Sequence, residues 1–210
     1  MTIKDFQVLV ATEEHTSFAE EICTEMAESA KARGTGIAKR SPEYVRSKMI
    51  EGKAVVAFHN DGRWAGFRYI ESWGHDDFVA NSGLIISPQF RGLGLARAIK
   101  EKTFHLSLDK FPGAKLFGLT TGLAVMKINS SLGYRPVTFS ELTDDEAFWK
   151  GCQSCINFPI LQSKNHKNCL CTAMIFDPAR DLNPNTSTST KAPSMWTAIF
   201  QKFATKKYNK

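Results

Sequence analysis

The sequence predicts a mixed α/β (α+β) fold, with one central sheet flanked by helices and a small cysteine-rich C-terminal extension. Two observations support this prediction. Up to Leu142, segments with strand and helix periodicity follow one another in the order β–α–α–β–β–β–α–β–α–β. Beyond Leu142, four of the five cysteines lie in one short stretch. The 210 residues suffice for one domain with a sizeable core and an appendage.

The first half of the chain opens with a predicted strand at residues 6–12, where apolar and polar residues alternate. Apolar residues at four-residue spacing then predict a helix that ends at Gly34. Residues 41–52 predict a short helix, because Ser and Pro open the segment and Gly closes it. An Asn-Asp-Gly turn between residues 54–59 and residues 64–73 predicts a hairpin.

The next elements lead to the end of the predicted sheet. Residues 78–87 form an apolar strand, and residues 95–108 show helical spacing up to a Pro-Gly break. A strand at 115–121, a short helix at 123–133 and a last strand at 134–142 complete the set. No segment repeats at a fixed period, so the chain is not a repeat protein.

We divide the chain into three parts. Residues 1–142 form the main domain, and residues 143–178 form the cysteine-rich extension, with a strand candidate at 171–176. Residues 179–210 combine a polar linker rich in Pro, Ser and Thr with a basic amphipathic tail. The aromatic stripe of that tail suits a membrane surface, a partner protein, its own domain, or a second subunit in a homodimer.

The charge is concentrated in the tail. The net charge is +6, and residues 191–210 carry five lysines and no acidic residue, which leaves +1 on the other residues. A nearly neutral body gives no reason to expect a nucleic-acid partner. The apolar runs are too short for a transmembrane segment, and the start of the chain shows no basic n-region. We therefore expect a cytoplasmic protein.

A glycine-rich turn is the strongest chemical signal. In "GLIISPQFRGLGLARAIKEKTF" an apolar strand passes through Gly92 and Gly94 directly into a helix. The unpaired amides at such a helix start, together with its dipole, favour an anion, and glycines let phosphate oxygens approach the backbone. Arg91 adds a cationic donor. The same glycines also suit a tightly packed turn. The spacing fits neither the dinucleotide fingerprint nor the Walker loop.

The wider pattern resembles the GCN5-related N-acetyltransferases (the GNAT family). The segment "QFRGLGLA" (89–96) is similar to the family signature Q/R-x-x-G-x-G/A, and it follows the hydrophobic-x-Pro step Ile86-Ser87-Pro88. Further on, "KINSSLGYRPV" is similar to the family's ending Gly-Phe, with Gly133-Tyr134 in its place. The resemblance covers about residues 5–140.

The resemblance implies an acyltransferase that moves the acetyl group of acetyl-CoA to a primary amine. The backbone amides of residues 91–96 would hold the CoA pyrophosphate. The preceding strand would part from its neighbour, pair with the pantetheine arm and offer an amide to the thioester oxygen. The implied CoA-binding residues are Leu84, Ile85, Ile86, Gln89, Arg91, Gly92, Leu93, Gly94, Leu95 and Ala96.

Two positions depart from the family's catalytic pattern. Asn129 stands where the family commonly has the tyrosine that protonates the leaving thiolate, and Gly122 stands where an asparagine is frequent. Asn129 is therefore a candidate hydrogen-bond donor to the sulfur rather than an acid. The strand at 78–87 has no acidic residue or histidine to act as a base. We favour Glu71 as the catalytic base; a chain of water molecules is the alternative.

The acceptor amine is less well specified. Arg33, Lys39, Arg40 and Arg68 are cations that suit a carboxylate, which favours a small-molecule amine such as an amino acid, with glutamate as an example. Some acetyltransferases of bacterial arginine synthesis have this family's fold. The same cations are also consistent with a solvated surface. Two other functions stay open: a protein N-acetyltransferase, and a weakly active regulatory module that binds CoA or metal.

The cysteine cluster predicts a structural zinc site. Cys152, Cys155, Cys169 and Cys171 supply the four thiolates of a tetrahedral site, with His166 as a substitute ligand. Reduced core cysteines and a redox pair are the alternatives. Cys23 lies beside apolar helix residues and is expected in the core. The expected cofactors are thus acetyl-CoA as the donor and a structural zinc ion.

Overall fold

The structure is a computed structural model, and it describes residues 1–34 and 38–182. The amphipathic tail and most of the linker predicted for residues 179–210 lie outside the described residues. Residues 35–37 of the basic loop also lie outside them. No helix in the described part of the chain is both long enough and apolar enough to cross a membrane.

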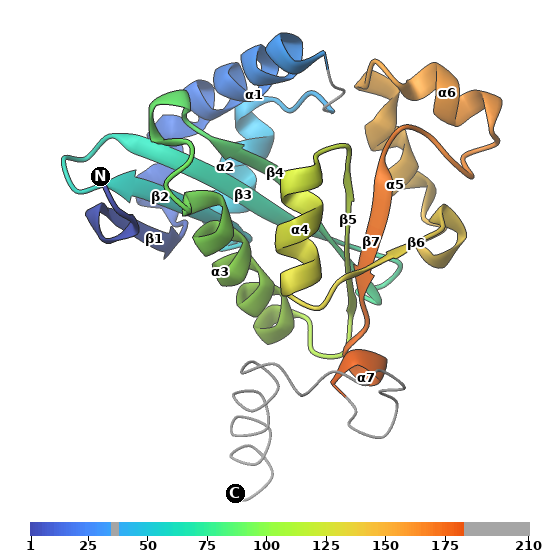
Figure 1. Ribbon diagram of the computed structural model, residues 1–210. Helices are drawn as coiled ribbons and strands as arrows, with labels where there is room; N and C mark the ends of the chain where they lie inside the picture. The colour runs from blue at the N-terminus through green and yellow to red at the C-terminus, as the bar shows by residue number, and fades with distance from the viewer. Residues whose placement is uncertain (35–37, 183–210) are drawn as a thin grey trace, which may run out of the picture.

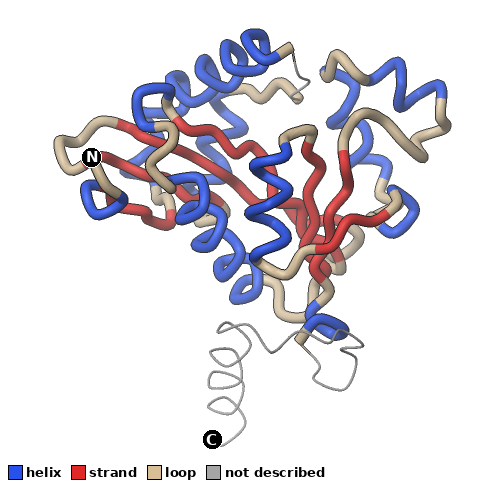
Figure 2. Tube along the Cα trace, in the orientation of Figure 1, coloured by secondary structure: helices blue, strands red, loops and turns tan. Residues whose placement is uncertain are grey.

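Seven strands form one sheet, in the spatial order β1-β2-β3-β4-β5-β7-β6 (Figures 1 and 2). Among the strands that the structure describes, the β4–β5 pair is parallel and the other neighbouring pairs are antiparallel. Their bounds are β1 Phe6–Val10, β2 Ala54–His59, β3 Trp64–Trp73, β4 Phe78–Ile86, β5 Lys115–Thr120, β6 Arg135–Val137 and β7 Thr172–Phe176.

Seven α-helices accompany the sheet within the described residues. They are α1 Ala19–Arg33, α2 Pro42–Ile50, α3 Leu95–Lys110, α4 Leu123–Ser131, α5 Glu146–Lys150, α6 Phe158–Ser163 and α7 Pro178–Asp181. The start of α2 follows its sequence signal: the Ser41 hydroxyl accepts a hydrogen bond from the Tyr44 amide at 3.2 Å. The left-handed Gly34 ends α1.

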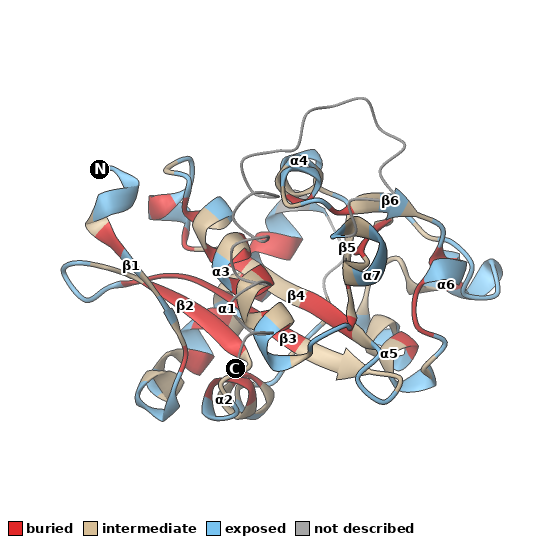
Figure 3. Ribbon diagram, turned by 90° about the horizontal axis from the view of Figure 1, so that it is seen from below, coloured by how far each residue is buried: buried red, intermediate tan, exposed pale blue. Residues whose placement is uncertain are grey.

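The helices cover both faces of the sheet. Along β2, Val56 belongs to the core under α1 and α2, whereas its neighbour Val55 belongs to the core under α3. Helix α4 lies on the α3 face, and α5 and α6 of the extension lie on the α1–α2 face. Figure 3 shows buried residues along the middle of the sheet and exposed ones on the outer sides of the helices.

The structure confirms the predicted mixed α/β fold and differs from it in detail. The strand predicted at 134–142 is shorter: β6 ends at Val137, and Phe139–Glu141 form a 3₁₀ turn. Pro136, which has no amide hydrogen, limits this edge strand. The strand predicted at 171–176 forms β7, which lies between β5 and β6. The extension therefore contributes a strand to the central sheet, and the domain boundary at residue 142 stays a prediction.

Candidate active site

The first feature of the site is the place where β4 and β5 part. The parallel ladder joins residues 78–80 to residues 115–117 and then stops. Nevertheless β4 continues to Ile86 and β5 to Thr120, and the two strands diverge in Figure 1. Backbone groups on the facing edges of both strands are thus left for another partner. We call this place the strand split.

A β-bulge in β4 lies next to the strand split. Phe67 of β3 faces Ile85. Two positions later Tyr69 faces Ser82, so two residues of β4 oppose one residue of β3. One of the two is Gly83, with φ +67°, and a Cβ atom there would lie 2.5 Å from Cε1 of Tyr69. Only glycine meets both demands, so this residue fixes the path of β4.

The second feature is the glycine turn between β4 and α3. Gly92 and Gly94 have φ +81° and +83°, and a Cβ atom built on either would meet no atom within 4 Å. Within the described chain, the amides of residues 92–96 donate no hydrogen bond; Arg97 is the first to do so, to the Gly94 carbonyl at 3.0 Å. A row of free amides, open space and a helix start together form an anion site.

The side chains of the turn are engaged elsewhere. Arg91 donates through Nε to the Ile86 carbonyl and through Nη2 to Glu25 and Ser29, so it ties the end of β4 to α1. Gln89 accepts a hydrogen bond from Arg63 at 2.6 Å. Four other predicted CoA residues have side chains that pack into the α3 core: Leu84, Ile86, Leu93 and Leu95. The side chain of Ile85 packs into the core on the opposite face. Ile85 and Leu95 are buried, so any ligand contact from these two residues would come from their backbone, whereas Leu84, Ile86 and Leu93 are only partly buried.

On the α1–α2 face, five side chains from α2, from β3 and from the loop before α2 form a group that we call the tyrosine cluster: Arg40, Tyr44, Lys48, Tyr69 and Glu71. The Glu71 Oε2 atom accepts from the Tyr44 hydroxyl and lies 2.6 Å from Lys48 Nζ. Burial, followed by the nearby Tyr69 and Glu71, raises the pKa of Tyr44. Alternation thus placed Glu71 correctly beside Tyr69, but its partner Lys48 was missed, because α2 packing brings it there.

Arg40 links the tyrosine cluster to the extension. Its Nε donates to the Tyr69 hydroxyl at 2.6 Å, and its guanidinium lies over the rings of Tyr44 and Tyr69. The neighbouring Lys39 amide donates to the Ser154 hydroxyl at 3.0 Å. Arg40 Nη2 also lies close to Gly151. The extension therefore borders the tyrosine cluster, which sequence reasoning could not show.

Two predicted residues lie away from the tyrosine cluster. Arg68 points to the α3 face, because it alternates with Phe67 and Tyr69 of the α1–α2 face. It is buried on the other face of the sheet from Arg40, and its predicted role toward a carboxylate stays a prediction. Asn129 is also buried, with Nδ2 at 3.4 Å from the Met174 sulfur and no partner for Oδ1 in the described chain.

The four clustered cysteines are free and partly buried. Burial, then Cys155 and Cys169, raises the pKa of Cys152 to about 11. Burial, then Cys169, raises the pKa of Cys171 to about 12. The thiols thus share one neighbourhood. No group of three or more Cys, His, Asp or Glu side chains in the described residues has the arrangement of a metal site. The ring of His166 stacks on Trp149 instead.

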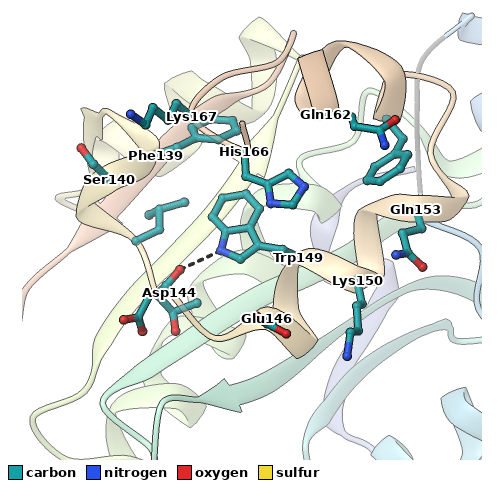
Figure 4. Close-up of a pocket in the computed structure, with 13 residues that line it drawn as sticks. Phe139, Ser140, Asp144, Glu146, Trp149, Lys150, Gln153, Gln162, His166 and Lys167 are labelled. Carbon is teal, nitrogen blue, oxygen red and sulfur yellow. Dashed lines mark hydrogen bonds between the residues drawn. The ribbon is translucent and has the colours of Figure 1, made fainter. Parts of the chain in front are cut away.

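A hollow of about 580 Å³ lies in the extension rather than at the glycine turn (Figure 4). Trp149 forms part of its wall and is held by a hydrogen bond from its indole nitrogen to the Thr143 carbonyl at 2.9 Å. None of the predicted catalytic, CoA-binding or cysteine residues lines this hollow. The candidate active site is therefore identified by the free amides beside the strand split and not by the volume of a cavity.

In sequence, the chain matches no protein-family model and no curated protein. In structure, it is similar to N-acetylglutamate synthase from Neisseria gonorrhoeae complexed with coenzyme A and N-acetylglutamate, with 16% identity and a TM-score of 0.59. That match covers 82% of this chain but only 35% of the synthase, so the chain spans about a third of that protein's length.

Two further solved structures match over most of their own length. The Mycobacterium tuberculosis protein Rv2747, in complex with CoA and NLQ, has 18% identity and a TM-score of 0.59; the match covers 81% of this chain and 98% of that one. A GNAT-family acetyltransferase from Staphylococcus aureus has 13% identity and a TM-score of 0.55, over 67% and 90% of the two chains. The chain therefore has the fold of the GCN5-related N-acetyltransferases, as the glycine-turn motif predicted.

Proposed function

We propose that this protein is an acetyl-CoA-dependent N-acetyltransferase whose acceptor is the primary amine of a small molecule. One observation carries the proposal: the unpaired amides of residues 92–96 lie at the head of α3, next to a β4–β5 ladder that stops at Ala80. Two of the similar structures hold CoA, which supports the same use of this fold here.

The residues of the glycine turn and the strand split fit acetyl-CoA as the acetyl donor. The glycine turn offers free amides, a helix start and space for a pyrophosphate. Beyond it, the backbone of residues 84–86 lies along the strand split, where the pantetheine arm would pair with it. Acetyl-CoA supplies the activated acetyl group, and the protein positions that group for attack by the amine. A backbone amide at the strand split would donate to the thioester oxygen.

We place the acceptor at the tyrosine cluster. Arg40 is a planar cation held by Tyr69, so it could receive a carboxylate in a fixed orientation. This supports an amino-acid acceptor such as glutamate, and the Neisseria synthase was solved with N-acetylglutamate. Glu71 stays our proposed base: its Oε2 is taken by Lys48 and Tyr44, while Oε1 has no hydrogen bond to any described residue and is available to the acceptor ammonium.

Asn129 and the cysteines carry two secondary proposals. Asn129 would donate to the CoA sulfur through Nδ2, whose one hydrogen bond within the described part of the chain goes to the Met174 sulfur. The four clustered cysteines would hold a structural zinc after a local rearrangement, and the support for that view is that they lie close to one another. Metal analysis should find about one zinc per chain; clearly less would refute the zinc proposal. The cytoplasmic location also stays a prediction.

The test is release of CoA thiol from acetyl-CoA with a panel of amines that includes glutamate, a polyamine and a lysine peptide. We expect turnover with the amino acid. Turnover with the peptide alone would favour a protein acetyltransferase. Thermal stabilisation by CoA without turnover on any amine would favour a regulatory module, because a ligand that binds the native state raises its stability.

A further inference from the structure

A positive charge is buried in the core beneath α3, and no anionic side chain among residues 1–34 and 38–182 lies beside it. Arg68 of β3 is 4% exposed. Its Nη2 donates to the Asn81 carbonyl at 3.1 Å, and its Nε has no hydrogen-bond partner in the described part of the chain. No carboxylate of the described residues forms an ion pair with it. Buried charges are ordinarily paired, so this arrangement requires a reason.

The groups around Arg68 are polar but not anionic. Helix α3 contributes Lys100, which is 1% exposed, and Ser107. The Ser107 hydroxyl accepts a hydrogen bond from the Asn81 side-chain amide at 3.2 Å. The Tyr134 hydroxyl and the Asn81 Oδ1 atom are buried without partners among the described residues. Burial and the nearby Arg68 lower the pKa of Lys100 to about 5, so the lysine is neutral at pH 7. Burial lowers the pKa of Arg68 only to about 10, so Arg68 is the charged member.

The position of this charge connects it to the strand split. Asn81 is the first residue of β4 beyond the last ladder pair, and its carbonyl oxygen lies 3.4 Å from the place of a Cβ atom on Gly118 of β5. A continuing ladder would give that carbonyl an amide of β5, but Arg68 occupies it instead. Arg68 also stands opposite the β4 bulge. The guanidinium therefore lies where the two strands part.

We propose, resting on the proposed function, that Arg68 stabilises the negative charge on the CoA sulfur as the acetyl group leaves. The amine lone pair attacks the thioester carbon, the C–N bond forms, and the C–S bond breaks with its electron pair going to sulfur. The excess amine proton passes to Glu71 or water. Arg68 keeps its proton and meets the thiolate as a cation. Asn129 cannot supply a proton at this point, so a fixed charge takes the place of an acid.

The positive charge of Arg68 should lower the pKa of the thiol of bound CoA. An opposite charge within a few ångströms lowers an acid's pKa by about 1–3 units. Bound CoA in the wild-type protein should therefore have a thiol pKa about 1–3 units below that of free CoA. Thiolate ultraviolet absorbance, recorded against the same protein with desulfo-CoA, measures this without turnover and cancels the protein's own cysteines.

Three variants separate charge from packing. Arg68→Met keeps an apolar stem and should return the bound thiol to the pKa of free CoA. Arg68→Lys should behave in the same way, because a lysine buried in this cluster loses its proton as Lys100 does, whereas the more basic guanidinium keeps it. Lys100→Met is the matched control, since it removes a neutral group from the same buried cluster and should leave the lowering in place.

The outcomes distinguish this inference from the proposed function. A wild-type complex whose CoA thiol titrates as free CoA does would overturn the role of Arg68 while leaving acetyl transfer intact, and this comparison needs no variant to fold. An unchanged lowering in a folded, CoA-binding Arg68→Met protein would overturn it too. Failure of the wild-type protein to bind CoA at all would instead reject both proposals.

Discussion

Gly92 carries the most direct residue-scale prediction. Its φ of +81° and the open space around it suit close approach of a phosphate to the backbone. Gly92→Ala should cost about 1–2 kcal/mol of stability through the left-handed backbone and at least about tenfold in CoA affinity through the added methyl group. Urea unfolding and calorimetric titration with CoA measure the two effects separately.

Gly113 offers the matched control for Gly92. It also has a positive φ, +87°, with no atom near a built Cβ, but it lies in the turn after α3, outside the glycine turn. Gly113→Ala should lose similar stability and keep its CoA affinity. If both variants bind CoA equally well, the glycine turn does not hold the pyrophosphate.

Arg40 carries the second prediction, on the acceptor. Arg40→Gln should raise the KM for a carboxylate-bearing acceptor by about tenfold or more, since one charge-assisted contact is lost, and change kcat less. The exposed Lys39→Gln is the control, because it removes the same charge from the neighbouring position. The measurement is steady-state kinetics with glutamate and with an analogue that keeps the amine but carries amides in place of the carboxylates. Equal effects of Arg40→Gln on the KM of both acceptors would contradict carboxylate recognition.

At this scale the sequence predicted backbone roles better than side-chain partners. The bare turn at Gly92 and Gly94 follows from local chemistry, and the structure gives both the expected left-handed conformation. The pairing of Glu71 with Lys48, and the burial of Arg68 on the other face from Arg40, depend on how α2 and α3 dock. Such contacts join distant segments, so spacing along the chain does not reveal them.

At the scale of the element, β4 is shaped by one residue. Gly83 interrupts an apolar strand, a signal that sequence reasoning passed over although glycine within a strand often marks a bulge. Gly83→Ala combines a strained φ with a clash against Tyr69 and should cost about 2–5 kcal/mol. Urea denaturation measures this.

Gly74 provides the comparison for Gly83, since it has a positive φ of +57° but its nearest contact to a built Cβ is 3.5 Å. Gly74→Ala should therefore lose only about 1–2 kcal/mol. Because the bulge sets the edge of the strand split, the Gly83→Ala protein should also bind CoA less tightly than Gly74→Ala. Equal stability losses in the two variants would show that the bulge tolerates a side chain.

At the scale of the whole molecule, the sheet separates the proposed donor site from the proposed acceptor site. The glycine turn and Arg68 belong to the α3 side, and the tyrosine cluster belongs to the α1–α2 side, with the strand split between them. The sequence predicted which segments are strands, but the insertion of β7 between β5 and β6 is a pairing of distant segments. Nothing local to residues 172–176 distinguishes that position from a sheet edge.

The buried Lys100 should make the free energy of unfolding depend on pH. Its pKa is lowered from 10.5 to about 5 in the folded chain, so between these values the unfolded chain binds the extra proton. The free energy of unfolding should therefore rise with pH across this window, by up to about 1.4 kcal/mol per pH unit from this group. Lys100→Met should remove the slope and be the more stable protein near pH 6, with its advantage shrinking toward pH 9. Urea denaturation at several pH values measures this.

Lys102→Met, at an exposed position on the same helix, is the control and should keep the wild-type slope. A wild-type slope in Lys100→Met would mean that Lys100 is charged in the fold, and the core beneath α3 would then hold two cations rather than one.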